Sequence, residues 1–291
     1  MSVAPATAGA ASIRQTARMS AVPLLRATHF APSLLVTAVS GVLAASVGRG
    51  VAGTAAVVAA VLAGQFSVGW GNDWVDRHRD AAAGRADKPI ASGEVRAWTV
   101  LLAAMAALAA CVAFSLLSGV RAASVHLLAV GLGWAYDLGA KRRVISVVPY
   151  ASAFGLLPVF VTTGLPGAPL PPWWAVVGAA LIGAGAHFVN ALPDLAGDAR
   201  TDVHGLPQRL GHGTSLMVAV VLLCVGAVVV LAGPGLGAAT LSGIAAVLAL
   251  TVAVAVAGRT GRERTAWSLT LGIAGVAVMA LAASGAALAL P

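Results

Sequence analysis

Long apolar segments follow one another along almost the whole chain, and they restrict its possible folds more than any other feature. Hydrophobic residues make up 59% and charged residues only 10% of the 291 residues, and the mean hydropathy is +0.92. Ordinary soluble domains are less apolar and more charged. The segments are continuously apolar rather than alternating, which favours helices over the strands of a closed barrel. We therefore expect an all-α polytopic integral membrane protein.

Most of the segments have about 20 residues, the length at which a helix crosses a hydrocarbon core of ~30 Å. We expect nine transmembrane helices that form a single domain over residues 27–291, after a flexible or interfacial N-terminal tail over residues 1–26. The expected spans are Phe30–Val47, Val51–Trp70, Trp98–Leu117, Ala122–Tyr136, Val144–Gly164, Trp173–Ala191, Thr214–Ala232, Leu236–Ala257 and Ala266–Leu290.

The basic residues set the expected orientation. With nine spans, all 18 Lys and Arg residues except Arg49 and Arg121 fall on one side of the membrane. By the positive-inside rule this side is cytoplasmic, so we expect a cytoplasmic N-terminus and a location in the inner (plasma) membrane. The net charge of +8 reflects this topology signal and attraction to anionic lipid. We expect no nucleic-acid partner, and the sequence does not indicate an oligomeric state.

Only ten acidic residues occur in the chain, and six of them form two clusters that each follow an apolar segment. The acidic residues of each cluster lie in one of two long expected cytoplasmic loops, roughly Gly71–Ala97 and Leu192–Gly213. Like charges repel one another, and ionised groups at a membrane are costly unless something compensates them. A hard divalent cation, which prefers carboxylate oxygens, is the natural compensation. The clusters consist of Asn72, Asp73, Asp76 and Asp80, and of Asn190, Asp194, Asp198 and Asp202.

The spacing within each cluster predicts one shared helical face. The three aspartates of the first cluster fall within about 60° of one another on a helix, and Asn72 widens this arc to about 100°. The four side chains of the second cluster follow a four-residue rhythm within an arc of about 120°. Pro193 removes one backbone hydrogen bond there without forbidding a helix. Each cluster is thus predicted to present a ladder of oxygen ligands at the cytoplasmic end of a span.

Oxygen-only ligands favour Mg²⁺ over zinc or copper. Mg²⁺ takes one or two carboxylates per ion and completes its shell with water and substrate phosphates, so two facing clusters suit a diphosphate. In the opposing interpretation, the aspartates are solvated helix-end charges paired with neighbouring arginines. Basic residues near the clusters are candidates for diphosphate binding: Arg77, Lys88, Lys141, Arg142, Arg143 and Arg209.

Three motifs resemble those of one known family. The N-D-x(2)-D-x(3)-D pattern over Asn72–Asp80, with D-K-P-I at Asp87–Ile90, resembles the first signature of the UbiA family of intramembrane prenyltransferases. The D-x(3)-D pattern over Asp194–Asp198 resembles the second signature. Tyr136 and Lys141 resemble the family's Y-x(4)-K element. The expected number of spans matches the family as well.

The resemblance implies a UbiA-like bundle and a prenyltransferase. In such an enzyme an allylic (poly)isoprenyl diphosphate binds through Mg²⁺ to both clusters and ionises to an allylic cation, which a lipophilic acceptor then attacks. The acceptor would be an aromatic quinone precursor or a lipid. The implied catalytic and metal-binding residues are Asp73, Asp76, Asp80, Asp194 and Asp198. The implied substrate-binding residues are Asn72, Arg77, Lys88, Tyr136, Lys141, Arg142, Asn190 and Arg209.

Two acidic residues depart from the family pattern. Asp202 occupies a position where many members have glycine, so it is either a further metal ligand or a spare carboxylate. Asp137, beside Tyr136, has an open role, and a salt bridge with Lys141 or Arg142 is the simplest interpretation.

Two polar residues inside spans are further candidates for substrate binding. Gln65 shares a helical face with Asp76, and His187 shares one with Asp194. Polar residues within spans tend to face the interior of a bundle. Both side chains either line the substrate chamber or form hydrogen bonds between helices.

Two other functions remain open at this stage. A terpene cyclase of the same family type would ionise the same diphosphate but would quench the cation without an acceptor. A transporter or binding protein for a diphosphate lipid would bind the same substrate without chemistry. Products formed without an acceptor would favour the cyclase, and recovery of intact substrate would favour the transporter.

Overall fold

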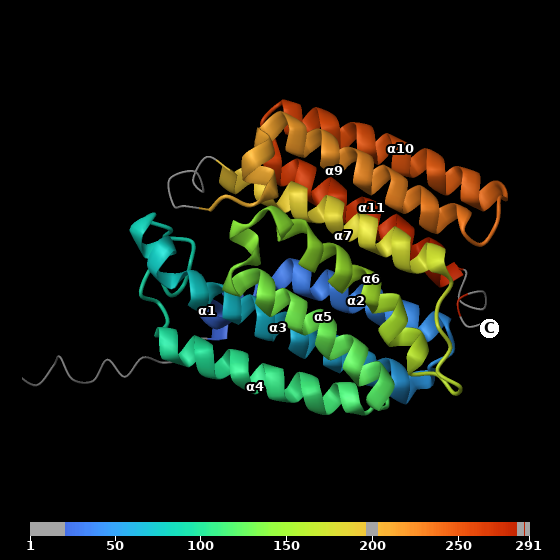
Figure 1. Cartoon of the computed structure of the whole chain (residues 1–291), viewed down its shortest axis with the longest axis horizontal. Coiled ribbons are helices and arrows are strands. Elements are labelled where there is room, and N and C mark those ends of the chain that lie inside the picture. The colour runs from blue at the N-terminus through green and yellow to red at the C-terminus, as the bar shows by residue number, and fades with distance from the viewer. Residues whose placement is uncertain (1–20, 196–202, 284–287, 289–291) are drawn as a thin grey trace, which may run out of the picture.

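The computed structural model describes residues 21–195, 203–283 and 288, and the part of the chain that it describes is helical, without strands. Successive long helices run antiparallel and form an elongated bundle (Figure 1). The expectation of an all-α fold is confirmed for these residues. The α-helices are α1 (Ala21–Arg26), α2 (Phe30–Ser46), α3 (Gly50–Ala82), α4 (Ala97–Leu116), α5 (Val120–Leu138), α6 (Val147–Thr163), α7 (Trp173–Ala191), α9 (Leu206–Ala232), α10 (Ala238–Arg259) and α11 (Glu263–Ala283). The short 3-10 helices are η1 (Ala140–Arg142), η2 (Val144–Ser146) and η3 (Leu192–Asp194).

Six helical segments are long and apolar enough to cross a membrane by length and composition, among the residues searched. Each of the nine expected spans coincides in position with one of the helices α2 to α7 and α9 to α11, but α2, α5 and α11 are not among the six. The finding supports a multi-pass membrane protein. Residues 1–20 of the expected N-terminal tail lie outside the described residues, and the end of the tail forms α1.

Both expected cytoplasmic loops are shorter than predicted. Helix α3 continues well past Trp70 to Ala82, so its connection to α4 comprises only residues 83–96. No proline interrupts this extension, and its acidic face is buried against the rest of the bundle. In the second loop, α9 already begins at Leu206, and Gly211 breaks its helical geometry with φ 75° and ψ 171°. A positive φ of this kind is readily adopted only by glycine.

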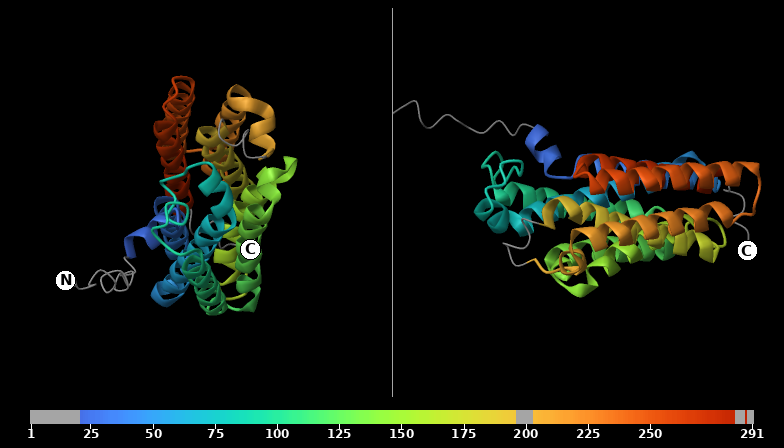
Figure 2. Two further views of the ribbon diagram at one scale, coloured as in Figure 1. Left: turned by 90° about the vertical axis from the view of Figure 1, so that its left-hand side faces the viewer. Right: turned by 90° about the horizontal axis from the view of Figure 1, so that it is seen from above.

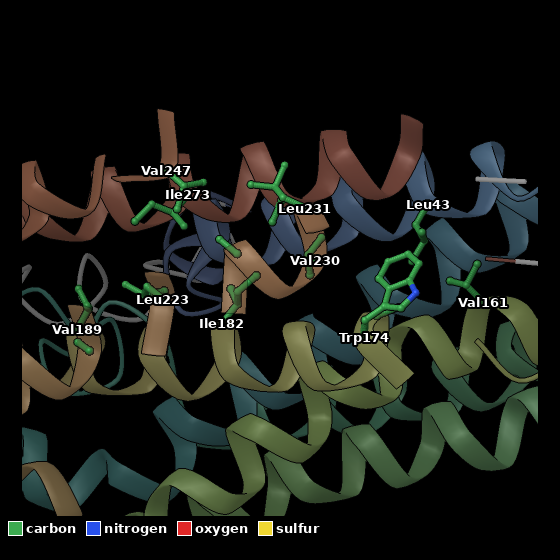
Figure 3. Close-up of a cluster of buried hydrophobic side chains, with 14 of the residues drawn as sticks. Leu43, Val161, Trp174, Ile182, Val189, Leu223, Val230, Leu231, Val247 and Ile273 are labelled. Carbon is green, nitrogen blue, oxygen red and sulfur yellow. The ribbon is translucent and has the colours of Figure 1, made fainter. Parts of the chain in front are cut away.

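A hydrophobic core joins the second half of the chain to α2. Leu43, Trp174, Ile182 and Leu223 belong to one buried cluster, and Figure 3 shows their side chains in the layer between α2, α7 and α9. Helices α7 and α9 approach closely, because a Cβ atom added at Gly178 would lie 3.0 Å from the backbone oxygen of Gly226. Small residues permit such close helix packing in membrane proteins.

Candidate functional site

The first acidic cluster lies on the buried face of α3, near its C-terminal end. The exposed fractions of Asp73, Asp76 and Asp80 are 1%, 2% and 3%. The predicted common face is therefore confirmed, but the side chains are not solvated helix-end charges. Taking three carboxylates out of water is costly unless cations or hydrogen bonds compensate them.

Three basic side chains from different segments compensate the cluster. Lys141 of η1 donates a hydrogen bond from Nζ to Oδ2 of Asp76 at 2.6 Å. Arg79 of α3 donates from Nη2 to the same oxygen at 2.8 Å, and its Nε lies 3.8 Å from Oδ1 of Asp80. Nζ of Lys88, from the α3–α4 connection, lies 3.5 Å from Oδ1 of Asp73. Lys88 and Lys141 therefore lie beside the first cluster, and their role in diphosphate binding stays a prediction.

A fourth carboxylate, Asp137 at the end of α5, belongs to the same group. Its side chain is 3% exposed, and its Oδ1 accepts a hydrogen bond from Nδ2 of Asn72 at 2.7 Å. Nζ of Lys141 lies 3.9 Å from the same oxygen, so the expected salt bridge is with Lys141. Arg142, the alternative partner, is exposed.

The buried oxygens of this group fit a hard cation. Both oxygens of Asp73 and Oδ1 of Asp76 are buried without a hydrogen-bond partner, and Nζ of Lys88 lies 3.5 Å from Oδ1 of Asp73. Buried acceptors nearly always have a partner, so these oxygens call for one. No group of three or more His, Cys, Asp or Glu residues stands close enough to hold a metal in the residues that were searched. Mg²⁺ needs fewer, because it binds through one or two carboxylates with water and phosphate as further ligands.

The second acidic cluster is built differently, and the prediction of a continuous helical ladder is wrong at its start. Helix α7 ends at Ala191, so Asn190 lies in its last turn and Asp194 in the 3-10 helix η3. Pro193 has no N–H for the next α-helical hydrogen bond, which favours this tighter turn. Asn190 and Asp194 are both exposed. Asp198 and Asp202 lie outside the described residues.

Arg85 of the α3–α4 connection pairs with the second cluster, and the sequence analysis did not identify this contact. Its Nη1 donates a hydrogen bond to Oδ1 of Asp194 at 3.2 Å, and its Nε and Nη2 donate to Asp87 at 2.9 and 3.0 Å. These bonds from Arg85 lower the pKa of Asp87. The contact joins residues 109 positions apart, so no local spacing could have indicated it. Figures 1 and 2 accordingly show the C-terminal ends of α3 and α7 at the same end of the bundle.

Three rings pack together, and one of them belongs to Tyr136, the residue directly before Asp137. Their centroids are 5.0 Å apart for Tyr136 and Tyr150, 5.6 Å for Tyr136 and His187, and 5.0 Å for Tyr150 and His187. Nε2 of His187 is 3.1 Å from Oγ of Ser146, so this histidine makes a hydrogen bond between segments, as one of its two interpretations proposed. Tyr150 was not predicted. It is one of only two tyrosines in the chain, which was its only signal.

Other predicted substrate-binding residues make different contacts. The guanidinium of Arg77 lies over the Trp74 ring, 4.4 Å from its centroid. Arg209 is exposed, and its Nε donates to the backbone oxygen of His204 at 2.9 Å. Gln65 is partly buried on α3. Among the described side chains, no ion pair joins Arg77, Arg142 or Arg209 to an aspartate.

Comparisons with known proteins agree on one family. The sequence model of the UbiA prenyltransferase family matches residues 33–271. A UbiA homolog from Aeropyrum pernix K1 has 19% identity and a TM-score of 0.70, over 86% of this chain and 96% of the other. A homolog from Archaeoglobus fulgidus bound to GPP and Mg²⁺ has 18% identity and a TM-score of 0.65, over 92% and 99%.

A structure described as digeranylgeranylglyceryl phosphate synthase in membranes has 16% identity and a TM-score of 0.62, over 91% of this chain and 98% of the other. No curated protein matches the chain. At these identities, the similarity to the solved structures shows a shared fold.

Proposed function

Since the chain belongs to the UbiA prenyltransferase family, we propose that it transfers a prenyl group from an allylic isoprenyl diphosphate to a lipophilic acceptor, with Mg²⁺ as cofactor. One observation carries the proposal: buried carboxylate oxygens without hydrogen-bond partners stand beside lysines in an acid-poor membrane protein. The solved UbiA homologs bound to GPP or DMAPP together with Mg²⁺ support the same substrate class.

The two acidic clusters would bind the metal and the diphosphate together. Asp73, Asp76 and Asp80 on one side, with Asp194 and Asp198 on the other, would hold Mg²⁺, which neutralises the diphosphate as a leaving group when it is bound. Asp202 remains a candidate further ligand. Lys88 and Lys141 already lie among the carboxylates and would donate hydrogen bonds to the diphosphate oxygens.

The rings and the apolar interior suit the rest of the substrate. In the reaction the allylic C–O bond breaks, the diphosphate leaves with the electron pair, and the acceptor attacks the resulting cation and then loses a proton. The faces of Tyr136 and Tyr150 can stabilise that cation. Beyond Tyr150, the Phe154 ring follows at 6.4 Å and borders an apolar cavity between α2, α6, α7, α9 and α11. We propose that this cavity takes the isoprenyl tail.

The proposal extends to topology. We propose nine membrane crossings in a single domain over residues 27–291, with the acidic clusters and the N-terminus on the cytoplasmic side of the plasma membrane. The asymmetric distribution of Lys and Arg supports this orientation. Cysteines introduced one at a time into exposed positions of the connections, and labelled from outside, would test it. Labelling of the α3–α4 connection from outside intact cells would contradict it.

Single alanine variants of Asp73, Asp76, Asp194 and Asp198 test the reaction. Purified protein is incubated with Mg²⁺, allylic diphosphates of several lengths and a panel of acceptors, and diphosphate release and product mass are measured. We expect each variant to lose transfer while it stays folded, and Glu94→Gln, an exposed carboxylate at the same end of the bundle, to remain active. Full activity of all four variants would contradict the proposal. Products without an acceptor would identify a cyclase, and intact substrate a transporter or binding protein.

A further inference from the structure

Asp137 is a buried carboxylate that the proposed reaction does not use. It lies at the C-terminal end of α5, 3% exposed, and it shares one oxygen between the Asn72 amide and the Lys141 ammonium. Its other oxygen is buried without a hydrogen-bond partner. A buried charge of this kind is strongly unfavourable unless its neighbours compensate it. Its position beside Asn72 of the first cluster and Lys141 therefore points to a function within the site.

The contacts of Lys141 suggest what this function is. Lys141 is 6% exposed and lies in η1, directly after α5. It has two carboxylate partners among the described residues, Oδ2 of Asp76 at 2.6 Å and Oδ1 of Asp137 at 3.9 Å. The first partner belongs to the acidic cluster, whereas the second stands only four positions earlier in the chain. The Lys141 ammonium thus lies near two carboxylates, Asp76 on α3 and Asp137 on α5.

Binding of Mg²⁺ would affect the two carboxylate partners of Lys141 differently. An Asp76 carboxylate that ligates Mg²⁺ shares its negative charge with the metal, and the Lys141 ammonium then has a like-charged neighbour. Like charges in a buried site repel each other, and the flexible lysine side chain can move away from the metal. A carboxylate outside the metal's ligand set would hold the Lys141 side chain in place. Asp137 is positioned for that role, because its Oδ1 is already turned to Lys141 and Asn72.

We propose that Asp137 is a positioning residue, the counter-ion that keeps Lys141 and the Asn72 amide aimed at the diphosphate once Asp76 takes up Mg²⁺. This inference rests on the proposed function. It separates the buried acids into two kinds: the α3 aspartates bind the metal, and Asp137 holds the groups that bind the diphosphate. Asp137 thereby acts on the substrate only through Lys141 and Asn72.

A purely structural role for Asp137 would have different consequences. A salt bridge that only stabilises the end of α5 would change the free energy of unfolding without changing diphosphate affinity in the folded protein. If Asp137 has a positioning role, its substitution must lower the affinity for diphosphate. This effect must disappear in a protein that lacks the Lys141 ammonium. A double-mutant cycle separates these cases because it isolates the coupling between two side chains.

The cycle compares the full-length protein with Asp137→Asn, Lys141→Met and the double variant. Binding of inorganic pyrophosphate at saturating Mg²⁺ is measured by calorimetry, and the thermal midpoint is measured in parallel. We expect Asp137→Asn to weaken pyrophosphate binding between about 10- and 100-fold, the loss typical when a residue that orients a ligating group is substituted. We expect the double variant to bind no more weakly than Lys141→Met alone. Asp137→Ser, which also removes the charge, guards against a folding defect specific to one substitution.

Glu94→Gln serves as the matched control, because it also converts a carboxylate to an amide at this end of the bundle. Among the described residues, Glu94 pairs with Arg26 and Ser92 and not with the buried acidic group. It should bind pyrophosphate as the unaltered protein does. Wild-type affinity in Asp137→Asn, or an equal loss in the presence and absence of Lys141, would overturn the inference and leave the proposed function standing. Failure of the unaltered protein to bind Mg²⁺ and pyrophosphate would overturn both.

Discussion

The two acidic clusters have similar sequence patterns but very different surroundings. The first lies on an uninterrupted α-helix, its three aspartates at most 3% exposed and paired with Arg79, Lys88 and Lys141. The second begins where α7 gives way to a 3-10 turn, and the side chain of Asp194 is 51% exposed with Arg85 as its partner. Similar motifs can thus form one half-site that is built into the core and another that stands open at the surface.

Asp76→Ala should have the largest effect, because it removes both a proposed metal ligand and the partner of two basic side chains. We expect transfer to fall below detection and the free energy of unfolding to fall by about 3 kcal/mol, since Lys141 then remains buried without its closest partner. Product formation and denaturant unfolding measure the two effects. An inactive variant with unchanged stability would show that the first cluster is less tightly integrated than its contacts indicate.

Asp194→Ala should be equally inactive but stable. Its ion pair with Arg85 at 3.2 Å is largely exposed, and such pairs contribute less than about 1 kcal/mol. The same two measurements therefore distinguish the clusters: both variants lose transfer, and only Asp76→Ala loses stability. A destabilised Asp194→Ala protein would contradict this distinction.

The sequence predicted the helical geometry of the first cluster better than that of the second for a physical reason. Helical periodicity places Asp73, Asp76 and Asp80 on one face as long as the helix continues. Helix α3 contains no proline and continues to Ala82. In the second cluster the same periodicity was applied across Pro193, where the backbone tightens instead.

Contacts between distant segments were out of reach for pattern analysis. Arg85 meets Asp194 only because the fold brings the α3–α4 connection next to η3. Asp137 was recognised as unusual, and a salt bridge with either Lys141 or Arg142 was expected. Its hydrogen bond with Asn72 depends on how α3 packs against α5. Sequence periodicity fixes which residues share a face and does not fix which faces meet.

Removal of Mg²⁺ should show how much each cluster contributes to the stabilisation of the folded protein by its ligands. With Mg²⁺ and pyrophosphate each at 100 times its dissociation constant, one such binding event stabilises the folded protein by about 2.7 kcal/mol. We expect this stabilisation in the unaltered protein, its loss on addition of EDTA, and its near absence in Asp76→Ala. Asp194→Ala should retain part of it, because the buried carboxylates and lysines of the first cluster remain. Thermal unfolding with and without ligands measures the shifts, and equal loss in both variants would contradict the ranking.

Arg85→Ala should have the smallest effect, and its direction is informative. Arg85 forms an ion pair with Asp194, and this ion pair must break before the Asp194 carboxylate can ligate a metal. The substitution therefore removes a group that competes with Mg²⁺ for Asp194. Because the exposed pair is weak, we expect the Mg²⁺ concentration for half-maximal transfer to fall by no more than about fivefold. Arg85→Lys, which keeps the charge, should stay close to the unaltered protein. A rise in the Mg²⁺ requirement of Arg85→Ala would instead show that Arg85 itself binds the diphosphate, and the open half-site would then contribute a cation as well as carboxylates.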